Sequence, residues 1–196
     1  MFSKLKKFCF PILSYLTIGY ISSFISINYI NPIKHSEPLP DLIFDITHQI
    51  TTYIPHCLLV LYGIYFLINV EKDTLPDFFK KLTTIFTIRL FTFTLTALPP
   101  VLPNCYSRLP DEPLEFNVVK VLLLNDDNTC LDMMFSGHAV HFVAFSCMLL
   151  KQKHTRRFTI LNTLYLICAL LSISISHLHY SSDVLVAATI TFLAFS

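Results

Sequence analysis

The chain has few charged residues and very little glycine. Of its 196 residues, 14% are charged, 54% are hydrophobic and three are glycine, and the mean hydropathy is +0.60. Soluble domains carry about 25% charged residues, so this composition excludes an ordinary soluble protein and indicates an integral membrane protein. Three glycines cannot supply a glycine-rich nucleotide-binding loop, so phosphate would have to be bound by side chains or helix ends. The sequence also shows no internal repeat and no coiled-coil heptad.

Six apolar runs are separated by charged or proline-rich breaks. A hydrocarbon core about 30 Å thick needs roughly 20 residues per helix. We therefore expect an all-α membrane protein, a six-helix transmembrane bundle that forms a single catalytic domain over residues 1–196. The last run is short, and at 1.5 Å per residue it covers only about 21 Å, so it is expected to be short or tilted. The helices are expected at about 9–30, 53–70, 82–102, 134–150, 158–176 and 183–196.

The first run follows a basic start, as a signal peptide does. It is long, however, and no A-x-A cleavage pattern follows it, which favours an uncleaved helix. Ten lysines and arginines lie in this start and in the loops after the second and fourth helices, against three in the remaining loops. Short cytoplasmic loops are rich in Lys and Arg, so both chain ends are expected in the cytosol and the acidic loops in the lumen or outside.

Cysteine placement does not suggest a disulfide framework. Four of the six cysteines fall in expected helices, where a thiol usually packs as a small apolar group. Cys105 and Cys130 share the expected lumenal side, and the sequence leaves open whether they form a bridge.

Two polar clusters meet at the expected lumenal boundary. The stretch CLDMMFSGHAVHFVAF carries Ser136, Gly137 and His138 at the start of the fourth helix, and HLHYSSDVLVAA carries His179 and Asp183 at the start of the sixth. Ionisable groups at membrane depth are costly and usually face a cavity, so the two clusters predict a site.

The spacing within these clusters suggests phosphoryl transfer. His179 and Asp183 are four residues apart, one helical turn, so the carboxylate can hold one imidazole nitrogen and leave the other as a nucleophile. His138 is expected at a helix N-terminus, which suits an anion such as phosphate, and it can protonate a departing alkoxide. This scheme, through a phosphohistidine, needs no metal and no cofactor. Arg89, inside the third apolar run, either reaches the interface or binds a lipid phosphate.

The other histidines are not expected to take part in catalysis. His141 is interpreted as core or cavity lining and His177 as a solvated neighbour of the site. The spacing of His177 and His179, without cysteines or carboxylates arranged around them, is a weak zinc pattern. No ligand spacing is found at His35, His48 or His56.

At these residues the chain resembles the sphingomyelin synthase family. The resemblance also covers EPLPDLIFD at 37–45, Arg89 and the LPP turn at 98–100, and so extends over most of the chain. Its most specific parts are the motifs C-x-D-x3-S-G-H and H-Y-x-x-D-V, formed here by Cys130, Asp132, Ser136, Gly137 and His138, and by His179, Tyr180, Asp183 and Val184.

The resemblance implies transfer of phosphocholine or phosphoethanolamine from a glycerophospholipid to ceramide, with release of diacylglycerol. His179, polarised by Asp183, would attack the phosphorus, and His138 would protonate the leaving diacylglycerol and then deprotonate the ceramide hydroxyl. The partners would be these lipids, with no nucleic acid, in the Golgi, endoplasmic reticulum or plasma membrane. The residues implied to contact substrate are Arg89, Asp132, Ser136, Gly137 and Tyr180.

Departures from the family pattern keep two alternatives open. Leu131 stands where the family has glycine and Ala139 where it has threonine, so the headgroup is undetermined. A lipid phosphate phosphatase shares the two histidines and the aspartate, although Phe135, Ile173 and Leu90 replace proline or arginine features that are typical of those phosphatases. A nonenzymatic lipid-binding or transport protein is the second alternative.

Overall fold

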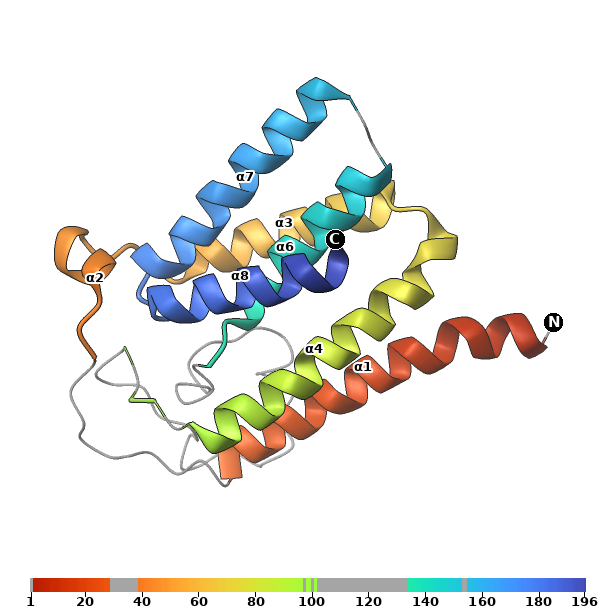
Figure 1. Ribbon diagram of the computed structural model, residues 1–196, viewed down its shortest axis with the longest axis horizontal. Coiled ribbons are helices and arrows are strands. Elements are labelled where there is room, and N and C mark those ends of the chain that lie inside the picture. Colours follow the sequence, from red (N-terminus) through yellow and green to blue (C-terminus); the bar gives the residue numbers. More distant parts are fainter. Residues whose placement is uncertain (1, 29–38, 97, 100, 102–133, 153–154) are drawn as a thin grey trace.

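The computed structural model is helical throughout the part of the chain that it describes, with no strand there. Its long helices run side by side and alternate in direction, so that α2 and the start of α8 lie at one end and the chain's N-terminus at the other (Figure 1). The described residues are 2–28, 39–96, 98–99, 101, 134–152 and 155–196.

Each of the six expected helices has a counterpart. The helices are α1 (Phe2–Asn28), α3 (Tyr53–Asn69), α4 (Leu75–Leu95), α6 (Gly137–Gln152), α7 (Arg156–Ile175) and α8 (Ser181–Phe195), together with the short α2 (Leu42–Ile46) and a single 3-10 turn, η1 (Lys72–Thr74).

The expected third helix differs most from the structure. It begins earlier, at Leu75, with Pro76 in its first turn, where a proline leaves no extra N–H unsatisfied. It ends at Leu95 instead of 102, because Pro99 has no N–H to donate to the Leu95 carbonyl and its ring would clash with that carbonyl in a continued helix. Beyond the helix, Leu98 and Val101 pack against Tyr180.

Among the described helices, only α7 is long and apolar enough to cross a bilayer by itself. The segment Tyr53–Asn69 passes the same test only together with Lys72–Leu95, and the two are bent by 112° relative to each other. Helix α8 is apolar but shorter. The six-span arrangement therefore stays a prediction.

Helix α6 lies at the centre and contacts α3, α4, α7 and α8, while α1 packs along α4. Its buried side chains include Ala139, Val140, Phe142 and Val143. Since the α6 sequence is apolar on nearly every side, it is buried as a central helix is expected to be. This position carries the first turn of α6, with His138, into the interior.

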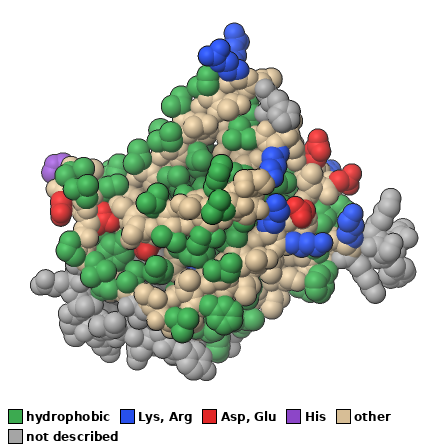
Figure 2. Space-filling model, in the orientation of Figure 1, with side chains coloured by type: hydrophobic (Ala, Val, Ile, Leu, Met, Phe, Trp, Pro, Cys, Tyr) green, Lys and Arg blue, Asp and Glu red, His purple; other side chains and the backbone are tan. Residues whose placement is uncertain are grey.

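The outer faces of the helices expose an unusual number of large apolar side chains. In the space-filling view, hydrophobic side chains spread over most of the visible face, and Lys and Arg gather toward one end and the tip of α7 (Figure 2). So many exposed apolar side chains mark a membrane or partner interface and here suggest membrane association. The most exposed examples are Leu95, Ile68, Leu42, Phe10, Tyr53 and Ile46.

Candidate active site

Helix α6 starts with a local cap that also ties it to α8. The Ser136 hydroxyl accepts a hydrogen bond from the Ala139 N–H at 3.3 Å, which is the usual bond of a serine N-cap. The Ser136 N–H donates to the Asp183 carbonyl at 3.4 Å. His138, in the first turn of α6, is thereby held beside the first turn of α8.

The structure buries the three expected reactive groups and brings the two histidine rings close to each other. His138, His179 and Asp183 are all buried, and the two imidazole centroids are 6.2 Å apart. Among the described residues, the Asp183 Oδ2 atom is buried without a hydrogen-bond partner. A buried carboxylate oxygen without a partner is costly, so Asp183 is a candidate functional residue.

The expected helical turn between His179 and Asp183 is not formed. Helix α8 begins at Ser181 with Tyr180 as its N-cap, so His179 lies before the helix. The four-residue spacing therefore does not by itself bring the imidazole to the carboxylate, and the path of the connecting turn decides where His179 points.

That connecting turn begins with a left-handed residue. The His177 N–H donates to the Ser174 carbonyl at 3.0 Å and the Leu178 N–H to the Ile173 carbonyl at 3.3 Å, the bond pair of a Schellman motif. His177 has φ 56°, which is unusual for a residue other than glycine. The motif ends α7 and returns the chain toward the bundle, so that His179 is buried.

His177 is not the solvated neighbour that the sequence suggested. It is half-buried, and its ring stacks on Phe44 with centroids 4.2 Å apart. Burial lowers the pKa of His177, an effect that the nearby Asp41 carboxylate opposes. Its contacts are with the segment before α3, and not with the reactive groups.

Arg89 lies inside the bundle and not at its edge. It is 6% exposed, its Nε atom donates to the Phe135 carbonyl at 2.6 Å, and its guanidinium lies near the rings of Phe86 and Phe93. A Cβ atom added at Gly137 would be 3.8 Å from the guanidinium, so glycine leaves space between Arg89 and the α6 N-terminus. The interface reading of Arg89 is therefore wrong for this structure.

Sequence reasoning missed His56. This residue of α3 has its Nδ1 atom 2.8 Å from His138 Nε2, with ring centroids 4.6 Å apart. One observation could have found it: His56 lies one turn inside the second expected helix, at the same expected lumenal depth as His138. His141, by contrast, bridges the Gly137 carbonyl at 2.8 Å and the Tyr15 hydroxyl at 2.6 Å, which agrees with its expected structural role.

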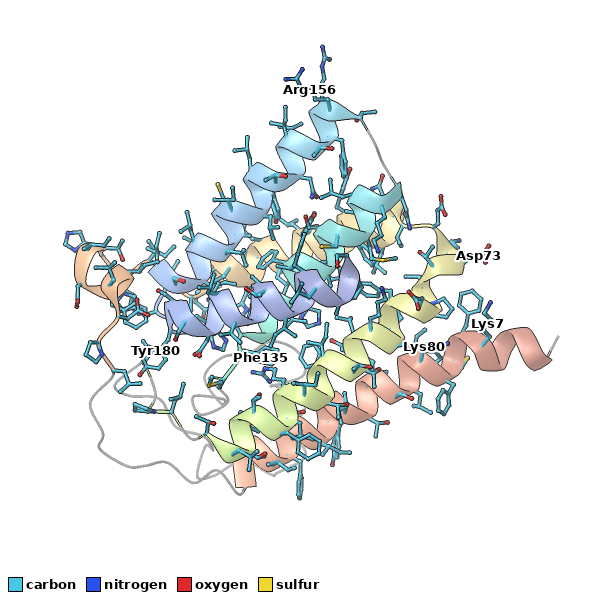
Figure 3. The ribbon with its side chains drawn as sticks, in the orientation of Figure 1. Lys7, Asp73, Lys80, Phe135, Arg156 and Tyr180 are labelled. Atoms are coloured by element: carbon cyan, nitrogen blue, oxygen red, sulfur yellow. The ribbon has the colours of Figure 1, made fainter. Side chains whose placement is uncertain are left out.

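The Tyr180 hydroxyl links the segments that contain Leu39 and Pro99. Its hydroxyl donates to the Pro99 carbonyl and accepts from the Leu39 N–H, both at 3.0 Å. Burial raises the pKa of Tyr180, so the phenol stays neutral. Figure 3 shows Tyr180 at the α2 end of the molecule, with Phe135 nearer its centre and Lys7, Asp73 and Lys80 at the opposite end.

A cavity of about 640 Å³ opens at Asp183, and its lining residues include neither His138 nor His179. Ligand pockets typically enclose about 300–1,000 Å³, so the cavity has the size of a small-ligand pocket. Its lining combines residues of the 39–43 segment, the end of α4 and the start of α8, among them Asp41, Thr96, Met134, Tyr180 and Asp183.

Several expectations lie outside the described residues: the contact of Asp132, the Cys105–Cys130 question, and His35. The other four cysteines are free thiols. Within the described ranges, no group of three or more His, Cys, Asp or Glu side chains is arranged to hold a metal ion.

Residues 129–196 match the family model described as PAP2 superfamily C-terminal. This superfamily contains phosphatases and phosphotransferases, and the match is consistent with a lipid phosphatase-related protein. The matched part is about a third of the chain and contains α6, α7 and α8, with His138, His179 and Asp183. No curated protein matches the chain.

Proposed function

We propose that the protein is a membrane-bound lipid phosphotransferase that moves phosphocholine or phosphoethanolamine from a glycerophospholipid to ceramide. The observation that carries the proposal is the joint burial of His138, His179 and Asp183 from two separate parts of the chain. The match of the same segment to a superfamily of phosphatases and phosphotransferases supports this class of chemistry.

The first step forms a phosphohistidine. A ring nitrogen of His179 attacks the phosphorus of the donor, a P–N bond forms, and the P–O bond to diacylglycerol breaks. His138 donates its proton to the departing oxygen, so diacylglycerol leaves as a neutral alcohol. Asp183 stabilises the positive charge on the His179 ring.

The second step returns the enzyme to its starting state. His138, now neutral, takes the proton of the ceramide primary hydroxyl as the oxygen attacks the phosphorus. The P–N bond breaks, His179 is released, and the headgroup phosphate is joined to ceramide. Each proton given up in the first step is recovered in the second, so no outside acid or base is consumed.

Arg89 and the start of α6 bind the phosphate in this scheme. A guanidinium binds phosphate oxygens through paired N–H groups, and a helix N-terminus favours an anion. Arg89 lies beside Gly137, at that N-terminus, so both contributions act on one position.

Burial supports transfer to a lipid hydroxyl over hydrolysis. His138, His179, Asp183 and Arg89 are each less than 10% exposed, so little water reaches the phosphohistidine. Excluding water protects a reactive intermediate until the second substrate arrives. A lipid phosphate phosphatase, in which water takes the phosphoryl group, uses the same groups and is the second candidate.

The membrane arrangement belongs to the same proposal. We assign six spans, cytosolic chain ends and a lumenal or exoplasmic site in the Golgi, endoplasmic reticulum or plasma membrane. The separation of Lys7 and Lys80 at one end from Tyr180 at the other supports this orientation (Figure 3).

The test uses the full chain in membranes with a fluorescent ceramide and, separately, each phospholipid donor. We expect ceramide-dependent release of diacylglycerol and a fluorescent product that carries phosphocholine, phosphoethanolamine or inositol phosphate. Ceramide-independent release of phosphate from phosphatidic acid would instead assign the protein to the phosphatases. Turnover of neither substrate by the well-folded protein would favour the lipid-binding alternative.

A further inference from the structure

One segment far from the reactive groups in sequence is packed over the turn that carries His179. Residues 39–50 contact residues 175–181 through the Leu39–Tyr180 hydrogen bond, the Phe44–His177 stack, and a bond from the Ile50 N–H to the Ile175 carbonyl at 3.2 Å. The turn is therefore held from outside the helices that it joins.

Asp41 makes the strongest of these contacts. Its Oδ2 accepts the Ser181 N–H at 2.6 Å, and its Oδ1 accepts the Ser181 hydroxyl at 2.7 Å and the Ile43 N–H at 2.9 Å. The Asp41 carboxylate thus caps α2 and also accepts the hydrogen bonds of Ser181, the first residue of α8. Hydrogen bonds to an ionised carboxylate are about twice as strong as neutral ones.

The position of Ser181 matters because the reactive groups flank it. His179 lies two residues before Ser181 and Asp183 two residues after it, and His179 belongs to neither α7 nor α8. Helical hydrogen bonds therefore do not orient His179 relative to Asp183. Ser181 is a fixed point between the two, and Asp41 holds it.

We propose that Asp41 is a positioning residue: by holding Ser181, it sets the orientation of His179 toward Asp183 and the phosphate. The inference rests on the proposed function in that it assigns His179 the attack on phosphorus. Asp41 itself touches no reacting atom in this scheme.

A second role for Asp41 would give a different kinetic result. Asp41 also lines the cavity beside the site, so its charge could instead attract a cationic headgroup. Loss of a headgroup contact raises the KM for the donor, whereas misorientation of His179 lowers kcat with KM nearly unchanged. Misplacement of a reacting group by about 1 Å costs roughly 100-fold in rate.

The experiment compares Asp41→Ala, Asp41→Asn and the control Asp45→Asn in the full-length protein. Asp45 is an exposed acidic residue of the same short helix, so its variant reports the effect of removing a charge there. We expect kcat to fall about 100-fold in Asp41→Ala with an unchanged donor KM, partial recovery in Asp41→Asn, which still offers one acceptor oxygen, and no change in Asp45→Asn.

Hydrogen–deuterium exchange of the peptide covering residues 176–184 gives a readout that needs no activity. We expect faster exchange in Asp41→Ala and no change in Asp45→Asn. Faster exchange with normal kcat would overturn the positioning role, and so would a raised KM with normal exchange. A wild-type protein without turnover of any lipid would overturn the proposed function alone, and a slowly exchanging 176–184 peptide in Asp41→Ala would overturn the inference alone.

Discussion

The two halves of the candidate site are built in different ways. His138 sits in the first turn of α6, where the Ser136 cap, two residues earlier, fixes the start of the helix. His179 lies in an irregular turn, and its surroundings are set by residues 39–50, more than 120 residues away in the chain. Local hydrogen bonds fix the position of a residue on a helix, whereas contacts with distant segments fix the position of a residue in a turn.

The largest expected effect comes from removing the candidate reactive histidine of either half. Replacing His138 or His179 with alanine should lower the rate of headgroup transfer by at least about 10³-fold, because the first supplies the proton and the second the nucleophile. Radiolabelled donor should leave a phosphoenzyme that is acid-labile and alkali-stable in wild type, and none in His179→Ala.

His141→Gln is a suitable control for this pair. It changes a histidine one turn further along α6 that bonds Tyr15 and has no role in the proposed transfer. Near-normal turnover in His138→Ala or His179→Ala would contradict the scheme.

Removing Arg89 should have the next largest effect. Arg89→Leu loses the guanidinium beside Gly137, so donor KM should rise by about 100-fold, the effect of losing a charge-assisted bond of about 3 kcal/mol. Arg89→Lys should recover part of this loss, since it keeps the charge without the fork geometry. Kinetics at varied donor concentration measure the change, and an unchanged apparent donor affinity in Arg89→Leu would return Arg89 to a structural role.

Replacing His56 tests whether contacts within α6 are enough to orient His138. His56→Ala removes the group 2.8 Å from His138 Nε2, so the His138 ring loses an orienting contact from α3. We expect kcat to fall by about tenfold, with His56→Gln retaining more activity because an amide can replace the hydrogen bond. His48→Ala, at an exposed position, serves as the control. Equal activity of wild type and His56→Ala would mean that α6 alone orients His138.

The smallest expected effect is on the pH dependence of stability, and it arises from Asp41, which holds the half of the site that contains His179. Burial raises the pKa of Asp41, but the hydrogen bonds from Ser181 and the Ile43 N–H outweigh it and hold the pKa below the ordinary value of 3.8. A carboxyl of this kind contributes its stability fully above its ordinary pKa and loses it as the pH falls through the folded-state pKa. The wild-type Tm should therefore fall more steeply than that of Asp41→Asn below about pH 4.

The titratable groups that face Asp41 are His177, Tyr180 and Asp183. These groups are the same in wild type and in Asp41→Asn, so the difference between the two curves of Tm against pH isolates the contribution of Asp41. The expected size is about 1 kcal/mol, that of one helix cap. Parallel curves for wild type and Asp41→Asn would show that the contacts of Asp41 add no net stability.

The sequence was sufficient to predict the helices, because their apolar runs are long and their ends carry charges or prolines. It placed the starts of α1 and α4 seven residues too late, because charged residues occupy the first turns of both helices. It also failed at the end of α4, where Pro99 cannot bond the Leu95 carbonyl, and at α2, whose five residues are too few to show a periodic pattern. It missed His56 because a single histidine in an apolar helix has no spacing that indicates a partner.

The sequence by itself determined the helical composition and selected His138, His179 and Asp183 as candidate reactive residues. Only the tertiary structure decided how they meet. It showed that Arg89 is buried beside Gly137, that His138 is paired with His56, and that Asp41 holds the start of α8. The physical reason is that apolar periodicity records only which face of a helix is buried. Hydrogen bonds between turns and helices distant in sequence depend on the three-dimensional path of the chain.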